Sequence, residues 1–534
     1  MSQDVLDAGT KKIKFKCGCV LDPATFSFDN IPLDCSETWK LVATGYTKGV
    51  FQIEKNLGKR YSEEVKPESV EELSDLVSLI RPGCLEAEFR EKPEDPGKFS
   101  SITNTYIKVK DGKWEPEYID PVLEPIFEAT RSVPIYQEQI MRICTDFAGF
   151  NLQEADVARK AVGKKKKDVM EKVKEKFIAG AIKMGHEEGL AETIFGWIEK
   201  FSGYGFNKSH GVSYAMIGYQ TAYAKRHFPL KFFKAMLTNS DGKQDSLEEI
   251  QELVFEARKF GVEVNPPNLK LLNLDFEVNE KDNSIAFGLG HIKGVGKSAF
   301  ESLRRVRNCR NPEEFLVKSF KKGTKVRKDV AEALIKSGAL DYMTPNRIGL
   351  LCAYKIMAIL TEREQKFIAE CLDNGDTFNH AFHQLLDSKI PNKSRKPRII
   401  AAVEELEKAL GGNKKKMAIA YERHYLGIPL SGSLVELYAN EYVNIKCTNF
   451  QRLRAGSQGS MGVVIEKIKR IKDKRGNWMC FLTVSDETYM LDCIVVFSSY
   501  YNKISWILEE GKPLLISGKK DKRGSFLVNH IEHL

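Results

Sequence analysis

The sequence lacks the features of membrane and secreted proteins. No apolar run approaches the roughly 18 to 20 residues that a membrane-spanning helix needs. The first residues, Met1-Ser2-Gln3-Asp4, do not begin a basic-then-apolar signal segment. We therefore expect a cytoplasmic protein with no membrane partner.

Several catalytic motifs are also missing. There is no Gly-x-x-x-x-Gly-Lys-Ser/Thr phosphate loop and no Gly-x-Ser-x-Gly nucleophile turn. Asp-x-Asp and His-x-His do not occur either. Two-metal phosphoryl transfer requires clustered carboxylates, and the nearest match, Glu86-Ala87-Glu88, lies in a polar stretch. We expect no catalytic residue and no metal site in this chain.

The eleven cysteines are mostly dispersed, which is typical of reduced thiols in a large cytosolic protein. Cys17-Gly18-Cys19 is the only close pair, and a metal knuckle would need a second pair at suitable spacing. The pairs His380 with His383 and His530 with His533 have no third ligand nearby. We interpret these histidines as surface residues.

The composition is that of a globular protein with several domains. The chain has 534 residues, 42% of them hydrophobic and 29% charged, and its formal net charge is +9. A chain of this length is too long for a single core. The small positive excess permits a nucleic-acid partner without requiring one.

A basic helix is predicted after Asn151. Asn151 is a good N-cap, and Glu154 stands three residues on, as in a capping box. We expect this helix to run to Val162 and to end at Gly163. Lys160 and Lys164 share one helical face, and Arg159 adds a planar fork suited to phosphate oxygens. A run of charges is, however, more often a solvated face.

A second candidate site follows Gly203-Tyr204-Gly205, where we expect Ser209 to cap a helix that continues to Arg226. Lys208 and His210 would then stand at the helix start, where a phosphate can bind. The alternative for His210 is a capping or packed histidine. The tyrosines along the same helix are candidates for base stacking or for the core; they are Tyr214, Tyr219 and Tyr223.

A glycine pattern farther along predicts a helix-hairpin-helix. Gly294-Val295-Gly296 lets backbone amides face outward, where a DNA phosphate can bind without sequence reading. Lys293 and Lys297 add positive charge on either side. The alternative is an ordinary glycine turn between helices.

The last part of the chain changes from helical to strand-like patterns. Short runs rich in β-formers are separated by the turns Lys474-Arg475-Gly476-Asn477 and Lys522-Arg523-Gly524-Ser525. Five short strands in about seventy residues are typical of an oligonucleotide-binding (OB) barrel. We expect Gly411-Gly412-Asn413 and the three lysines after it to form a loop.

At these motifs the sequence resembles the alpha subunit of bacterial DNA polymerase III, a family C polymerase. The matching segments fall in the family's order: Ile31-Pro32-Leu33-Asp34, Gly49 to Glu54, Arg81-Pro82-Gly83, Tyr136-Gln137-Glu138-Gln139, Ala155 to Lys166, Phe206 to His210, Tyr219-Gln220-Thr221, Ser337 to Asp341 and Leu426 to Gly432. The resemblance covers roughly Ile31 to Leu534.

The resemblance implies a multidomain fold. It predicts a mainly α fingers domain over 31–239, a helix-hairpin-helix domain that is clamp-binding in the family over 240–435, and an all-β OB-fold barrel over 436–534. Residues 1–30 form an N-terminal arm. By the same resemblance, the incoming nucleotide is bound by basic residues of the fingers; these are Arg159, Lys160, Lys164, Lys165, Lys208 and His210.

The sequence departs from the family at its beginning, where the arm stands in place of the metal-binding N-terminal domain, thumb and palm. We therefore expect a split DNA-directed DNA polymerase, inactive as this chain alone. A separate chain would supply the palm aspartates and bind Mg²⁺, while this one binds dNTP and template-primer DNA. A sliding clamp is a further implied partner, although Gln384-Leu385-Leu386 matches the family's clamp motif poorly. The alternative is a non-catalytic DNA-binding or regulatory protein acting on a clamp or replisome.

Overall fold

The structure is a computed structural model that describes residues 13–15, 17–22, 27–164, 167–201, 205–438, 442–450, 452–522 and 524–534. The chain divides into two compact units, Met1–Pro229 and Leu230–Leu534. Within the described ranges, no helix has both the length and the apolar character to cross a bilayer. The predicted boundary between residues 239 and 240 remains a prediction.

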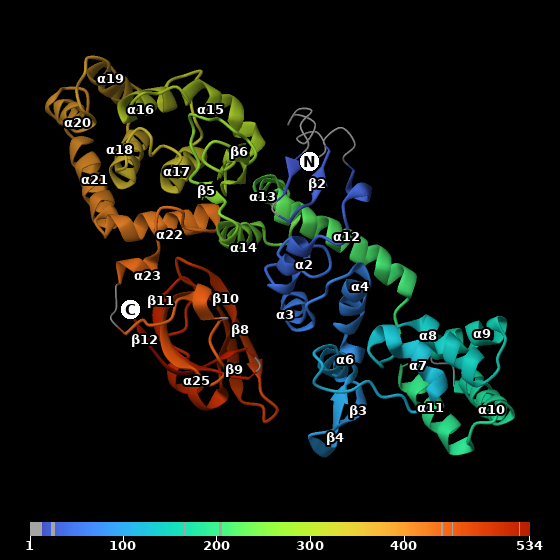
Figure 1. Cartoon of the computed structure of the whole chain (residues 1–534). Helices are drawn as coiled ribbons and strands as arrows, with labels where there is room; N and C mark the ends of the chain where they lie inside the picture. Colours follow the sequence, from blue (N-terminus) through green and yellow to red (C-terminus); the bar gives the residue numbers. More distant parts are fainter. Residues whose placement is uncertain are drawn as a thin grey trace. The chain divides into compact units, whose positions relative to one another are not determined.

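The first unit is mainly helical (Figure 1). Its helices are α2 (Ser36–Ala43), α3 (Asn56–Val65), α4 (Val70–Leu79), α5 (Pro82–Glu86), α6 (Ile102–Lys110), α7 (Glu124–Phe127), α8 (Gln137–Arg142), α9 (Leu152–Lys164), α10 (Lys167–Lys183), α11 (Glu188–Phe201) and α12 (Lys208–His227). Two small antiparallel pairs accompany them, β1 (Ile13–Lys14) with β2 (Val20–Leu21) and β3 (Glu88–Lys92) with β4 (Asp95–Ser101).

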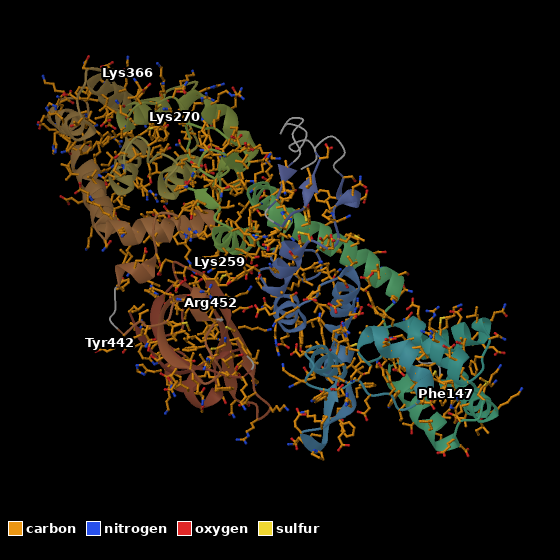
Figure 2. The ribbon with its side chains drawn as sticks, in the orientation of Figure 1. Phe147, Lys259, Lys270, Lys366, Tyr442 and Arg452 are labelled. Atoms are coloured by element: carbon orange, nitrogen blue, oxygen red, sulfur yellow. The ribbon has the colours of Figure 1, made fainter. Side chains whose placement is uncertain are left out.

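Helices α7 to α11 enclose one hydrophobic core. Phe147, labelled in Figure 2, is fully buried there and stacks on Phe177. The predicted capping box at the start of α9 is confirmed, because Asn151 Oδ1 accepts from the Glu154 amide and Glu154 Oε2 accepts from the Asn151 amide. The predicted end at Gly163 is wrong, since α9 continues to Lys164.

Helix α12 is the longest helix of the first unit that the structure describes, and it packs against α4 and α2. Its N-cap is Asn207, whose Oδ1 accepts from the His210 amide at 2.9 Å. The prediction that Ser209 caps this helix is therefore wrong. Tyr219 and Tyr223 are almost fully buried on α12, so they belong to the core and do not stack on bases.

The second unit begins with further helices and a small sheet. The helices are α13 (Pro229–Thr238), α14 (Ser246–Lys259), α15 (Phe300–Val306), α16 (Pro312–Phe320), α17 (Lys328–Ser337), α18 (Arg347–Ile359), α19 (Glu362–Asp373), α20 (Phe378–Asp387), α21 (Lys396–Leu410), α22 (Lys414–Leu426), α23 (Leu434–Leu437) and α24 (Cys447–Phe450). The sheet has the order β5 (Glu263–Asn265), β7 (Ser284–Ala286), β6 (Glu277–Asn279). The three lysines predicted to lie in a loop begin α22, because Asn413 caps that helix.

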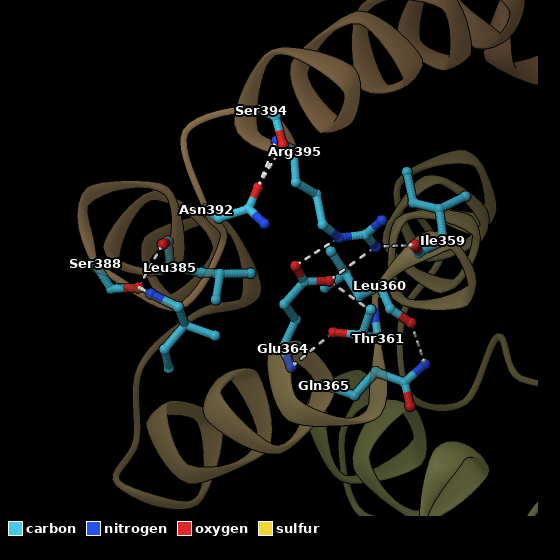
Figure 3. A network of polar contacts seen from close by, with 11 residues as sticks. Ile359, Leu360, Thr361, Glu364, Gln365, Leu385, Ser388, Asn392, Ser394 and Arg395 are labelled. Atoms are coloured by element: carbon cyan, nitrogen blue, oxygen red, sulfur yellow. Dashed lines mark hydrogen bonds and ion pairs between the residues drawn. The ribbon is translucent and has the colours of Figure 1, made fainter.

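Polar side-chain contacts connect α21 to the junction of α18 and α19. Glu364 completes a capping box with Thr361 at the start of α19 and also binds the guanidinium of Arg395 at 2.7 Å, as Figure 3 shows. Arg395 donates in addition to the carbonyl of Ile359. One arginine before α21 therefore ties that helix to the junction of α18 and α19.

The chain ends in a closed five-stranded barrel of order β10-β12-β11-β8-β9. The strands are β8 (Gln458–Lys472), β9 (Trp478–Ser485), β10 (Met490–Val496), β11 (Pro513–Lys520) and β12 (Phe526–His533), with α25 (Ser498–Ile504) between β10 and β11. All neighbours pair antiparallel except β10 and β12, which are parallel. This topology is that of an OB fold, and it confirms the predicted fold class.

Candidate nucleotide and DNA interface

Two motifs that lie seventy residues apart in the sequence meet at the start of α8. Tyr136 and Phe206 form a parallel backbone bridge, in which the Gln137 amide donates to Phe206 O and the Phe206 amide donates to Ile135 O. The Gln137 side chain also donates to Gly205 O at 2.9 Å. This bridge brings the start of α12 beside α8.

Arg159 extends this arrangement onto α9. Its Nη1 donates to Gln137 Oε1 at 3.1 Å, and its Nε and Nη2 both donate to Asp156 Oδ1. Gln137 therefore bridges the arginine and the chain segment that leads into α12. The basic residues that the sequence predicted on two separate helices are connected through one amide side chain.

Asp156 balances the charge of this surface. It pairs with Lys160 at 2.6 Å and with Arg159 at 2.8 Å, one turn farther along α9. The hydrogen bond from Lys160, and after it that from Arg159, lowers the pKa of Asp156. Arg159 and Lys160 thus share one carboxylate on the surface of α9.

The first turn of α12 holds a second carboxylate. Glu138 accepts from the Lys208 amide and from the Asn207 side chain at 2.9 to 3.1 Å. A negative group at this place is favourable because the first amides of a helix lack partners within the helix. The Lys208 ammonium lies 5.7 Å from the centre of the Tyr136 ring.

His210 packs among rings. Its ring lies 4.0 Å from that of Tyr214 and 5.3 Å from that of Phe206, centre to centre. Arg81 covers the same Phe206 ring at 4.1 Å and adds a guanidinium near the helix start. His210 is nevertheless exposed to solvent, so one edge of the ring remains accessible.

The buried carboxyl group of Asp75 holds the Tyr136 side chain through a hydrogen bond. Asp75 on α4 accepts from Tyr136 Oη at 2.7 Å and from Tyr106 Oη at 2.9 Å. Burial raises the pKa of Asp75 to about 6, although the hydrogen bonds from the two tyrosines oppose this shift. Asp75 therefore sets the position of the residue that caps α8.

Most residues of the predicted hairpin turn are exposed, although the Val295 amide donates to Ile292 O. Gly294 adopts φ +90°, which favours glycine, and open space lies where its side chain would be. Val295 is buried, whereas Lys293, Gly294, Gly296 and Lys297 are exposed. The Lys293 amide donates to Tyr425 O at 2.9 Å, which anchors the turn to α22.

Two loops of the barrel repeat one sequence, Asp-Lys-Arg-Gly. They join β8 to β9 at Asp473 and β11 to β12 at Asp521, and in each loop the aspartate amide and carboxylate bind the residue four positions on. Lys474 and Lys522 are both exposed. In OB folds these two loops border the face that binds oligonucleotides.

The remaining predicted residues are placed only in part. Lys164 is the last residue of α9, its side chain is not among those described, and Lys165 lies outside the described residues. Sequence reasoning assigned a site role to Arg159, Lys208 and His210, and noted the motif that contains Gln137 and Glu138 without assigning these two residues a role. The signal was present, since both belong to the Tyr136-Gln137-Glu138-Gln139 motif.

Comparison with known proteins finds two family matches within the chain. Residues 4–185 match the model of the bacterial DNA polymerase III alpha subunit finger domain, and residues 261–350 match a helix-hairpin-helix motif. The chain therefore resembles the finger domain of a bacterial replicative DNA polymerase, together with a helix-hairpin-helix region, and its structure adds an OB-type barrel.

The particular relatives are DNA polymerase III alpha subunits. The chain is 33% identical over 504 residues to that of Aquifex aeolicus, 33% over 505 residues to that of Bacillus subtilis and 32% over 532 residues to that of Thermus aquaticus. These matches cover 93%, 93% and 97% of the chain, but only 38%, 41% and 39% of the relatives. The chain is a relative of these subunits that spans about two fifths of their length.

Proposed function

We propose that this chain is the fingers and DNA-binding part of a family C DNA polymerase that acts in DNA replication. It binds the incoming dNTP at the surface formed by α9 and the start of α12, and it binds template-primer DNA through the helix-hairpin-helix and the barrel. The observation that carries this proposal is the contact of Arg159 with Gln137, which joins the two basic segments into one surface.

The charges of that surface suit a triphosphate. Arg159, Lys160 and Lys208 supply three cations, and the start of α12 adds backbone amides. We propose that phosphate oxygens take the place of the Asp156 and Glu138 carboxylates, which accept from Arg159 and from the Lys208 amide. Positioning a triphosphate and offsetting its charge is most of what phosphoryl transfer asks of a protein.

The described residues do not fit a two-metal site for phosphoryl transfer. Among them, no group of three or more carboxylates converges as a Mg²⁺ pair would require. We propose that Mg²⁺ and the catalytic aspartates are held outside these 534 residues, on a separate chain. The separate chain is tested by co-purification, followed by primer extension with the chain alone and with its co-purifying partner.

We expect extension only when the partner is present, because no cluster of carboxylates that could bind two Mg²⁺ ions occurs among the described residues. Steady extension by the pure chain with Mg²⁺ would refute the division of labour. A chain that copurifies with no catalytic partner, yet binds DNA, would instead favour the alternative of a non-catalytic replisome protein. Binding to a sliding clamp is measured in the same preparation.

The nucleotide site is tested by Arg159→Ala in the active assembly. Losing a charge-assisted contact of about 1.5 to 3 kcal/mol should lower kcat/KM for dNTP by about 10- to 100-fold. The Kd for template-primer DNA should change less than about threefold. The matched control is Arg142→Ala, which removes an exposed arginine of α8 that pairs with Asp146. A fall in DNA affinity alone would show that α9 binds DNA and not nucleotide.

A further inference from the structure

A group of metal-binding side chains lies at the far end of α12 from Lys208. Cys17, Cys35 and His227 place their ligand atoms within 4.8 Å of one another. Cys35 Sγ is 3.6 Å from Cys17 Sγ and 3.2 Å from His227 Nε2. Sequence analysis did not detect this group, because Cys35 is 18 residues from Cys17 and 192 residues from His227 in the sequence.

Cys19 lies two residues after Cys17 on the same turn, and its thiol is outside the group of three whose ligand atoms are mutually within 4.8 Å. The turn that carries Cys17 and Cys19 is closed by two backbone hydrogen bonds, from Phe15 N to Cys19 O and from Gly18 N to Phe15 O. Gly18 adopts φ +89°, so the turn requires glycine between the two cysteines.

The distances match a tetrahedral metal site. With Zn–S near 2.3 Å and Zn–N near 2.0 Å, tetrahedral angles place two sulfurs about 3.8 Å apart and a sulfur and a nitrogen about 3.5 Å apart. The observed 3.6 and 3.2 Å need only small adjustments to reach these values. A disulfide would instead bring two sulfurs to about 2.05 Å.

We propose that Cys17, Cys35 and His227 form a structural zinc site, which Cys19 completes as the fourth ligand through a small movement of the turn that it shares with Cys17. Thiolate and imidazole ligands in a tetrahedral set select Zn²⁺ over the oxygen-seeking Mg²⁺ and Ca²⁺. With four protein ligands the site leaves no open position for substrate, so its role is structural. The proposal does not depend on the proposed polymerase function.

The zinc would join three segments of the first unit. Cys17 and Cys19 lie on the turn between β1 and β2, Cys35 is the N-cap of α2, and His227 is the last residue of α12. The rings of Phe15 and Tyr223 pack on His227 at 4.3 and 4.4 Å and cover one side of the group. The metal would thus fix the end of the helix whose other end carries Lys208 and His210.

The test is metal analysis of the full chain, purified under reducing conditions without chelator. We expect about one Zn²⁺ per chain, retained against a colorimetric zinc chelator, because structural sites bind tightly. Cys35→Ser and His227→Ala should each lower the content at least tenfold. The matched controls, Cys352→Ser and His380→Ala, remove the same residue types outside the group and should leave it unchanged.

Cobalt substitution keeps the test decisive if a variant folds poorly. Co²⁺ added to the metal-free wild-type chain should give thiolate charge-transfer absorption, and Cys19→Ser should lower its intensity and weaken zinc binding at least tenfold. Equal zinc affinity of Cys19→Ser and wild type would overturn the fourth ligand. A zinc-supplied wild-type chain without bound metal, or with a Cys17–Cys35 disulfide under reducing conditions, would overturn the site.

Discussion

At the scale of single residues, the buried carboxyl of Asp75 makes the first unit sensitive to pH. Desolvation raises its pKa from 3.8 to about 6 in the folded protein. Between pH 3.8 and pH 6, Asp75 is therefore protonated to a larger extent in the folded protein than in the unfolded chain. This contribution to stability is complete below about pH 3.8 and is lost as pH rises through 6, on the order of 3 kcal/mol in total.

Asp75→Asn should remove this pH dependence, because the amide stays neutral. We expect hydrogen exchange in α4 and α6, corrected for intrinsic rates, to differ between pH 4.5 and 7 in the wild type and much less in the variant. Tyr106→Phe provides the opposite control, since it removes a hydrogen bond that lowers the pKa of Asp75 and should shift the window upward. An unaltered pH response in Asp75→Asn would show that another group titrates.

Arg347 is a buried residue that connects two sequence motifs of the second unit. It binds Asp341 at 2.6 Å and lies 2.7 Å from Glu422, whose side chain is 0% exposed. Glu422 in turn accepts from the amides of Leu430 and Ser431. Arg347 and Glu422 together thus link the motifs Ser337 to Asp341 and Leu426 to Gly432, which gives these motifs a structural role.

Arg347→Ala should cost about 3 to 5 kcal/mol of stability, because it leaves a buried carboxylate without its cation. Urea unfolding followed by far-UV circular dichroism, with hydrogen exchange of α22, measures this loss. Lys366→Ala is the control, since its pair with Glu370 is 79% and 64% exposed and should contribute less than about 0.5 kcal/mol. Similar losses in both variants would contradict the assigned role of the buried pair.

At the scale of secondary structure elements, close approach explains where glycine is required in a helix. A Cβ on Gly180 in α10 would lie 2.1 Å from the Ala148 carbonyl oxygen, a backbone atom that cannot easily move. Gly196 in α11 has nothing within 4 Å of the same position. Both glycines are in helices that enclose the same core, but close packing requires glycine only at position 180.

Gly180→Ala should therefore destabilise the first unit by about 1 to 3 kcal/mol through overpacking. Gly196→Ala should stabilise it by up to about 1 kcal/mol, because alanine favours the helix and meets no atom. Thermal unfolding and hydrogen exchange of α10 and α11 report the two opposite signs. The same sign in both variants would mean that the packing of α10 on the segment after η4 (Ile143–Phe147) is not as described.

At the scale of the whole molecule, the proposed binding of duplex DNA by the hairpin should depend on salt concentration. Each lysine that neutralises a phosphate contributes about 0.9 to the slope of log K against log salt concentration. Replacing both Lys293 and Lys297 by alanine should make this slope shallower by about 1 to 2. Fluorescence anisotropy with labelled duplex DNA over a salt series measures it.

The control for this experiment removes two exposed lysines outside the hairpin, Lys366 and Lys389. We expect that double alanine variant to keep the wild-type slope. If the hairpin variant also kept it, the exposed turn at Gly294 would be only a connection between helices, as the alternative interpretation of the sequence held.

The sequence by itself determined the kinds of element and their order. The change from helical to strand periodicity predicted the barrel. Asn151 with Glu154 predicted the start of α9, and Gly294-Val295-Gly296 predicted the hairpin. These signals are local, since caps, turns and periodicity depend on residues a few positions apart. Helix boundaries near Gly163, Ser209 and Lys414 were less certain, because neighbouring residues offered competing caps and ends.

Only the tertiary structure decided which distant residues meet. The bridge between Tyr136 and Phe206 put Arg159 and Lys208 on one surface, and the fold brought Cys35 and His227 to Cys17. Burial of α12 against α2 and α4 also placed Tyr219 and Tyr223 in the core. The physical reason is that such contacts depend on how whole helices pack, which no short stretch of sequence encodes.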